Sequence, residues 1–70
     1  MPDVINHVDK TTMVLLTELK DECLRYIKLT DQIELEGLTE DQLANILGEL
    51  TASTAHLNIH SETVKKIIEQ

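Results

Sequence analysis

The sequence predicts an all-α fold in which two long helices form an antiparallel hairpin. Two stretches of the chain each carry apolar residues at alternating steps of three and four, which is the repeat of a helix that buries one side. A helix-start signal lies between these stretches, near residue 39. Strand signals are poor, because Gly and Pro are scarce and hairpin-turn dipeptides are missing from the sequence. We therefore expect one helical hairpin domain over 9–70, preceded by a flexible N-terminal arm at 1–8.

The first helix is expected over about 9–36, with Asp9 or Thr11 as its N-cap. Steps of three and four connect one line of residues along it, namely Leu16, Leu19, Cys23, Tyr26, Thr30 and Ile33. Further apolar residues, among them Leu15, Leu24 and Ile27, make this stripe wider than the seam of a two-stranded coiled coil. A stripe of that width is typical of a helix in a bundle.

Residues 37–43 carry the signal for the turn and for the second helix. Gly37 can adopt the left-handed conformation that ends a helix. Thr39 is then the expected N-cap, with Gln42 three residues later completing a capping box. Leu38 and Leu43 occupy the two positions that form a hydrophobic staple across a helix start. These cues together place the start of the second helix at Thr39.

The second helix is expected over about 39–69. Its inward line steps by three and four through Leu43, Ile46, Leu50, Ser53, Leu57, His60, Val64 and Ile67. Residues 51–63 include many poor helix formers, and Asn58 or Ser61 can cap a separate last helix. The alternative to one long helix is therefore a break near 58–61.

Two helices joined by a short turn can bury only part of such wide stripes. A turn at residues 37 and 38 places Tyr26 opposite Leu50 and Cys23 opposite Ser53. Apolar side chains beside this seam would remain exposed, which usually indicates association. We expect a homodimer that forms a four-helix bundle. Its expected core residues are Leu16, Leu19, Cys23, Tyr26, Leu50, Leu57 and Val64.

Charge is distributed unevenly along the chain. The sequence has 13 Asp and Glu against 6 Lys and Arg, and its formal net charge is −7. Residues 29–64 contain seven of the acids and neither Lys nor Arg. Five acids would cluster around the turn as a docking surface for a protein partner with a basic surface, namely Asp31, Glu34, Glu36, Glu40 and Asp41.

The composition also indicates which classes of partner to expect and in which cellular compartment the protein is found. The net charge of −7 repels nucleic-acid backbones, and the single aromatic residue leaves little for stacking on bases. We therefore expect no direct nucleic-acid binding. The sequence shows neither a secretory signal nor an apolar run long enough to cross a membrane, and its single Cys suggests a reducing compartment. These features favour a soluble, cytoplasmic protein without a membrane partner.

Histidine and cysteine are the two residue types in this sequence that we considered as metal ligands or as a nucleophile. His56 and His60 are spaced four apart, so both rings can share one helix face and supply two metal ligands, or four across a dimer axis. Cys23 lies on the expected seam, where an apolar setting raises the pKa of a thiol and makes it a core filler rather than a nucleophile. We expect no cofactor and no enzymatic activity.

The function expected from these features is a small non-enzymatic interaction module, such as a regulator, an inhibitor or an assembly adaptor. It would act through its apolar helical stripe and its acidic hairpin tip. Two alternatives stay open: a metal- or ligand-binding protein that uses His56 and His60, and an accessory subunit of a larger enzyme complex.

Overall fold

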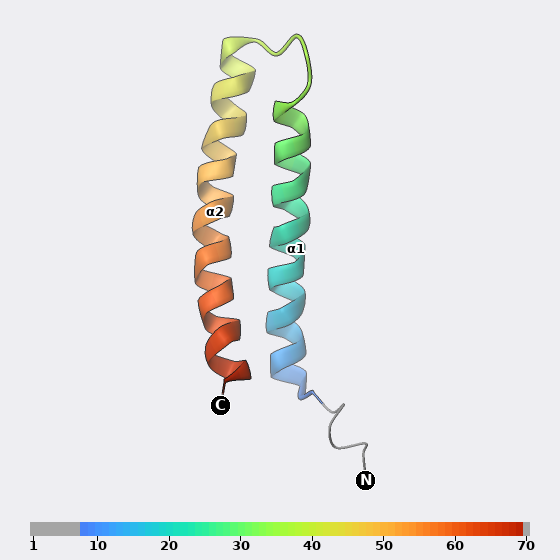
Figure 1. Cartoon of the computed structure of the whole chain (residues 1–70), viewed down its shortest axis with the longest axis vertical. Helices are drawn as coiled ribbons and strands as arrows, with labels where there is room; N and C mark the ends of the chain where they lie inside the picture. The colour runs from blue at the N-terminus through green and yellow to red at the C-terminus, as the bar shows by residue number, and fades with distance from the viewer. Residues whose placement is uncertain (1–7, 70) are drawn as a thin grey trace.

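The structure, a computed structural model, describes residues 8–69, which form two long α-helices. Helix α1 spans Lys10–Ile33 with 24 residues, and helix α2 spans Glu40–Ile68 with 29. The helices run antiparallel and side by side, with the loop at one end and the start of α1 beside the end of α2 at the other (Figure 1). The described residues contain no strand. The predicted all-α hairpin is thus confirmed, while the predicted arm lies outside the described residues apart from Val8.

Both helix starts carry the caps that the sequence predicts. The Asp9 carboxylate, at Oδ1, accepts a hydrogen bond of 2.7 Å from the Thr12 N–H at the start of α1. At the start of α2, the Thr39 hydroxyl accepts from the Gln42 N–H at 3.1 Å, and the Gln42 Oε1 accepts from the Thr39 N–H at 2.9 Å. These bonds satisfy backbone donors that a helix start otherwise leaves unpaired.

The predicted end of the first helix is wrong by three residues. Helix α1 ends at Ile33 rather than near 36, and two tight bonds close its last turn: Glu34 N–H to the Asp31 carbonyl at 3.2 Å and Leu35 N–H to the Gln32 carbonyl at 3.1 Å. Gly37 does adopt a positive φ, of 80°, but inside the loop rather than directly at the helix end. The loop needs this left-handed residue to turn the chain into α2.

Helix α2 is continuous, so the alternative break near 58–61 is wrong. The polar side chains in this stretch bond to the helix itself instead of capping a new one. The Ser61 hydroxyl donates to the Asn58 carbonyl at 3.1 Å, and the Thr63 hydroxyl donates to the Ile59 carbonyl at 3.0 Å. Packing against α1 outweighs the weak helix propensity of these residues.

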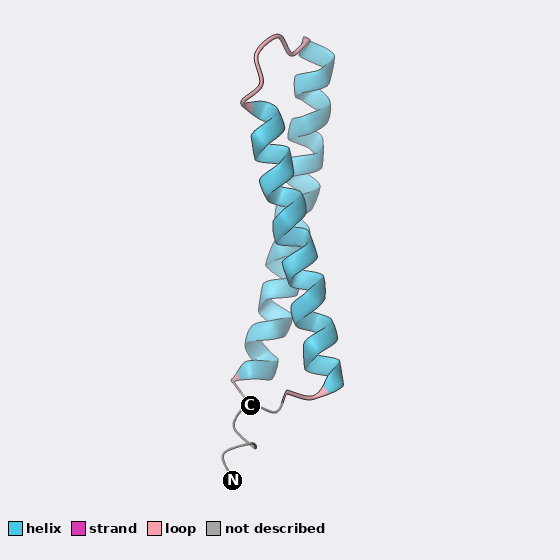
Figure 2. Ribbon diagram, turned by 90° about the vertical axis from the view of Figure 1, so that its right-hand side faces the viewer, coloured by secondary structure: helices cyan, strands magenta, loops and turns pink. Residues whose placement is uncertain are grey.

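The core lies along the line where the helices meet, and they cross near their middle (Figure 2). Its buried apolar residues among those described are Leu29, Ile46 and Val64. The predicted inward line of α2 is confirmed at seven positions, which are buried or half-buried: Ile46, Leu50, Ser53, Leu57, His60, Val64 and Ile67. Leu43 is the exception, because 39% of it is exposed near the loop.

Helix α1 is rotated slightly from the predicted seam. Leu16, Leu19, Tyr26 and Ile33 are half-buried as expected, but Cys23 is exposed. Glu22 takes its place and bonds to Ser53. The prediction that Cys23 faces Ser53 is therefore wrong. Steps of three and four from Leu19 reach Tyr26 through Glu22 as well as through Cys23, and the hydroxyl of Ser53 offers the carboxylate a donor.

Candidate functional site

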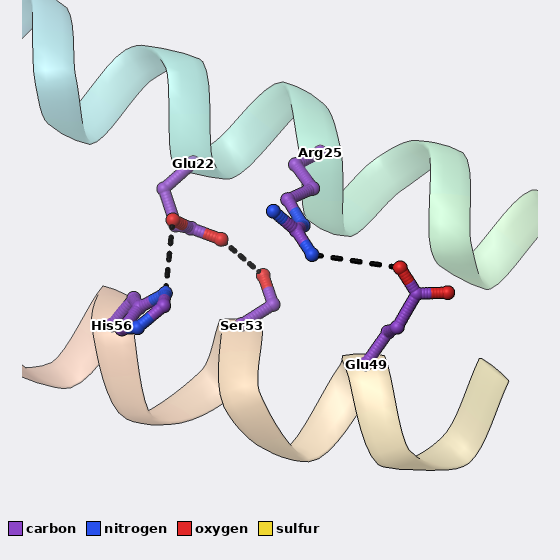
Figure 3. Close-up of polar contacts among 5 residues, drawn as sticks. All are labelled: Glu22, Arg25, Glu49, Ser53 and His56. Carbon is purple, nitrogen blue, oxygen red and sulfur yellow. Dashed lines mark hydrogen bonds and ion pairs between the residues drawn. The ribbon is translucent and has the colours of Figure 1, made fainter. Parts of the chain in front are cut away.

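A polar cluster interrupts the apolar seam at the middle of the hairpin (Figure 3). Ser53 on α2 is fully buried, and its hydroxyl donates to the Glu22 Oε2 atom of α1 at 2.7 Å. The other carboxylate oxygen of Glu22 lies 3.4 Å from the His56 Nδ1 atom. Only 12% of the Glu22 side chain is exposed, against 54% for His56. The cluster therefore joins an inward carboxylate to a ring at the edge of the seam.

A second pair extends the cluster toward the loop. The Arg25 Nη2 atom lies 3.5 Å from the Glu49 Oε1 atom, and about half of each side chain is exposed. Glu22 and Arg25 lie three residues apart on α1, and Glu49 and His56 lie seven apart on α2, so each pair of residues shares one side of its helix. These contacts thus mark one side of the hairpin, which we call the polar flank.

The cluster favours the charged form of Glu22. The hydrogen bond from the Ser53 hydroxyl is the main cause that lowers the pKa of Glu22, and the nearby His56 and Arg25 lower it further. Partial burial of the carboxylate opposes this effect by raising the pKa. The net result is a carboxylate whose pKa is below its usual value and whose acceptor oxygens are directed at α2.

Sequence reasoning missed this cluster. The heptad pattern favoured the apolar Cys23 over Glu22, because charged residues rarely face a core unless they are paired. Ser53 was the available signal, since a polar residue on an otherwise apolar inward line requires a hydrogen-bond partner. The cluster holds the two helices in one alignment, because each side chain bonds across the seam to a specific residue.

Within residues 8–69, His56 and His60 are not joined by further side chains into a metal site. His60 is half-buried on the inward line, whereas His56 lies on the polar flank against Glu22. Among residues 8–69, no group of three or more His, Cys, Asp or Glu side chains is arranged to hold a metal ion. The described part of one chain therefore offers at most the histidine pair itself.

The predicted acidic residues do gather at the loop end of the hairpin. All five are exposed: Asp31, Glu34, Glu36, Glu40 and Asp41. We call this set the acidic loop end. Glu40 and Asp41 lie in the first turn of α2, where the helix dipole stabilises negative charge. Beside them, a surface hollow of about 330 Å³ is lined by Gln32, Leu35, Leu38, Gln42, Asn45 and Ile46.

Exposed apolar residues follow the side of the hairpin opposite the polar flank. Each residue of an α-helix is turned by about 100° from the last, so two positions correspond to about 200°. Cys23 and Ile27 each lie two positions from Arg25, and Leu47 lies two positions from Glu49. All three are therefore directed away from the polar flank, and from both helices they reach the same face.

Heptad spacing extends this face along the hairpin. Met13 lies fourteen residues before Ile27, and Ile68 lies twenty-one residues after Leu47, so both return to the same side. Leu43 lies one turn before Leu47. We call this set the apolar flank: Met13, Cys23, Ile27, Leu43, Leu47 and Ile68. Its large hydrophobic members are 39–64% exposed, and Cys23 is exposed too.

Neither α1 nor α2 combines the length and the apolar character required to cross a membrane. No family model, no curated protein and no solved structure matches the chain.

Proposed function

We propose that this chain is a small interaction module, without enzymatic activity of its own, that acts as a regulator, an inhibitor or an assembly adaptor. In this proposal, two copies pair through their apolar flanks into a four-helix bundle. The acidic loop end then binds a protein partner that has a basic surface. The observation that carries the proposal is the apolar flank, because the hairpin leaves it exposed along its length.

The size of the face that carries the apolar flank supports pairing of two copies. Helix α2 has 29 residues, which corresponds to a length of about 43 Å. The hairpin is 19 Å across in its second dimension, so one broad face covers roughly 800 Å². A stable interface of ordinary size hides about 800 Å² on each partner. One face of the hairpin is therefore large enough for a specific dimer.

Two substitutions on the apolar flank test the dimer. Ile27→Glu and Leu47→Glu together place four like charges in the interface of the pair, and we expect the chain to become monomeric. Sedimentation equilibrium measures the mass, and circular dichroism checks that the variant stays helical. If the double variant loses its helices, the milder Ile27→Ser serves in its place.

Ile59→Glu is the matched control, because Ile59 is 61% exposed on α2 and lies two positions from the inward Leu57, away from the apolar flank. This variant should stay dimeric. A natural chain that is folded and monomeric at high micromolar concentration would contradict the dimer. A chain that is monomeric and poorly folded alone would favour an obligate subunit of a larger complex.

The acidic loop end supports the second part of the proposal. Its five carboxylates are exposed, and none forms an ion pair among residues 8–69. Unpaired charges of one sign attract an oppositely charged surface over a distance of about 10 Å at moderate salt. The hollow beside them, which is lined in part by Leu35, Leu38 and Ile46, gives such a partner an apolar contact as well.

Replacing Glu34, Glu36 and Glu40 with Gln tests the loop end without changing side-chain size. The probe is a lysine-rich peptide, and its affinity is measured by calorimetry over a salt series. We expect weaker binding and a shallower salt dependence for the triple variant. The control is Glu18→Gln with Glu62→Gln and Glu69→Gln, three exposed acids outside the loop end. Equal binding by both triple variants would contradict a specific role for the loop end.

A further inference from the structure

Charge differs strongly between the two halves of the hairpin. The half nearer the loop, residues 22–53, holds seven carboxylates and two basic residues, which gives a net charge of −5. The other half, residues 8–21 and 54–69, holds five carboxylates and four basic residues, which gives −1. We call the end formed by the second half the open end. Its basic residues include Lys10 and, in the last turn of α2, Lys65 and Lys66.

The same asymmetry appears on the side of the apolar flank. Glu34 lies seven residues after Ile27, which places it on this side at the loop end. Lys65 lies one turn before Ile68, which places it on this side at the open end. Both side chains are exposed, and neither forms an ion pair within residues 8–69. The same heptad steps also pass through Lys20 on α1 and through Thr54 and Ser61 on α2. Each copy therefore presents a face of apolar and polar residues with an acid at the loop end and bases toward the open end.

Building on the dimer proposed above, we propose that the second copy lies antiparallel on the apolar flank, with its open end against the loop end of the first. A two-fold axis perpendicular to the helices then places α1 against α1 of the other copy and α2 against α2. Glu34 of each copy lies at the same end of the bundle as Lys65 of the other copy. The parallel arrangement instead places the two strongly acidic halves side by side. Like charges in such contact disfavour that arrangement.

The antiparallel arrangement also keeps the polar cluster away from the interface. The flank that carries Glu22, Arg25, Glu49 and His56 is directed away from the second copy, so its charges stay at the edge of the bundle. Cys23 and Ile27 lie near the middle of α1 and contact the second copy close to the axis. The two acidic loop ends come to opposite ends of the bundle.

Distances between spin labels test the orientation directly. A label at Leu35→Cys, in a chain that also carries Cys23→Ala, reports on the loop, where Leu35 is 61% exposed. The antiparallel dimer places the two labels about 40 Å apart or more, which is the length of a helix. The parallel dimer places them roughly 20 Å apart, since packed helices lie 8–10 Å from one another and each label adds its own length.

Ala55→Cys in the same background is the matched control. Ala55 is exposed near the middle of α2, so its two labels lie at the same height along the bundle in either orientation and report only that a dimer forms. A dimer with a short distance between the Leu35 labels overturns the antiparallel orientation but not the dimer. Absence of any dipolar signal at both sites, with a monomeric mass, overturns the dimer itself.

Charge reversal provides an independent measurement. Lys65→Glu and Glu34→Lys should each raise the dimer dissociation constant about two- to fivefold, because each turns an exposed attraction into a repulsion. The double variant restores the attraction, so its dissociation constant should return to that of the natural chain. In a parallel dimer Glu34 lies at the same end of the bundle as Glu34 of the other copy, and Lys65 lies at the same end as its own counterpart. The double variant therefore shows no such recovery. Lack of recovery therefore overturns the proposal.

Discussion

Glu22 shows how a charged side chain is accommodated between two small helices. Burying a carboxylate costs free energy unless partners replace the lost water. Ser53 and His56 supply these partners from α2, at 2.7 Å and 3.4 Å. Apolar contacts alone tolerate a sliding helix, whereas this cluster bonds only when Glu22 lies opposite Ser53. At the scale of residues, the cluster therefore specifies the alignment of α1 against α2.

Ser53→Ala tests the value of this bond. The substitution removes one hydroxyl and leaves the Glu22 carboxylate without its closest donor. We expect the free energy of unfolding to fall by about 1 kcal/mol, the usual net worth of a hydrogen bond. Urea unfolding followed by circular dichroism measures it. Ser61→Ala is the control, because the exposed Ser61 bonds only to the Asn58 carbonyl of its own helix; an equal loss in both variants would contradict the specific role of Ser53.

The lowered pKa of Glu22 predicts the direction of a pH effect. As pH falls, the unfolded chain takes up this proton first, near the ordinary pKa of 4.5, while the folded protein resists it. The contribution to stability is therefore complete above about pH 5 and is lost as pH falls through the lower pKa of the folded state. Glu22→Gln removes the titrating group.

Unfolding measured between about pH 5 and pH 3 should therefore show a smaller loss of stability in Glu22→Gln than in the natural chain. Ser53→Ala should also reduce this loss, since the Ser53 hydroxyl is the main cause that lowers the pKa. Identical pH dependence in all three proteins would show that the cluster does not form in solution.

At the scale of elements, the sequence predicts helix starts better than helix ends. A start is encoded by named side chains, and Asp9, Thr39 and Gln42 make the predicted bonds. The end of α1 depends instead on how the backbone closes its last turn, which side-chain patterns describe poorly. The rotation of α1 was missed for a related reason: two adjacent residues, Glu22 and Cys23, fit the same spacing.

Thr39→Ala tests the capping box at the start of α2. The substitution removes the acceptor for the Gln42 N–H, and we expect stability to fall by about 1 kcal/mol. Thermal unfolding measures this change. The control is Thr51→Ala at an exposed position inside α2, where the hydroxyl donates only to the Leu47 carbonyl. That variant should be neutral or slightly more stable, because Ala is the better helix former; a loss as large as that of Thr39→Ala would contradict the capping role.

At the scale of the whole molecule, the exposed residues could be predicted from the sequence more successfully than the contacts between the two helices. The acidic residues near the turn and the apolar residues Leu24, Ile27, Leu47 and Ile68 are exposed as predicted. Periodicity within one helix reveals such stripes. Only the contacts of Glu22 and Arg25 across the seam show which sides of α1 and α2 share a flank, because a sequence does not state how two helices are turned toward each other.

The single short loop at one end has a consequence for how the hairpin opens. A contact next to the loop encloses a short stretch of chain, whereas a contact between the start of α1 and the end of α2 encloses almost the whole hairpin. Each doubling of the enclosed length costs about 0.6 kcal/mol more in chain entropy. Opening should therefore begin at the end of the hairpin where α1 starts and α2 ends. Hydrogen exchange on the monomeric Ile27→Glu, Leu47→Glu variant should show protection that declines from the loop outward; uniform protection along both helices would mean that the hairpin opens only as one unit. The two helices should therefore stay paired longest next to Gly37, beside the acidic loop end.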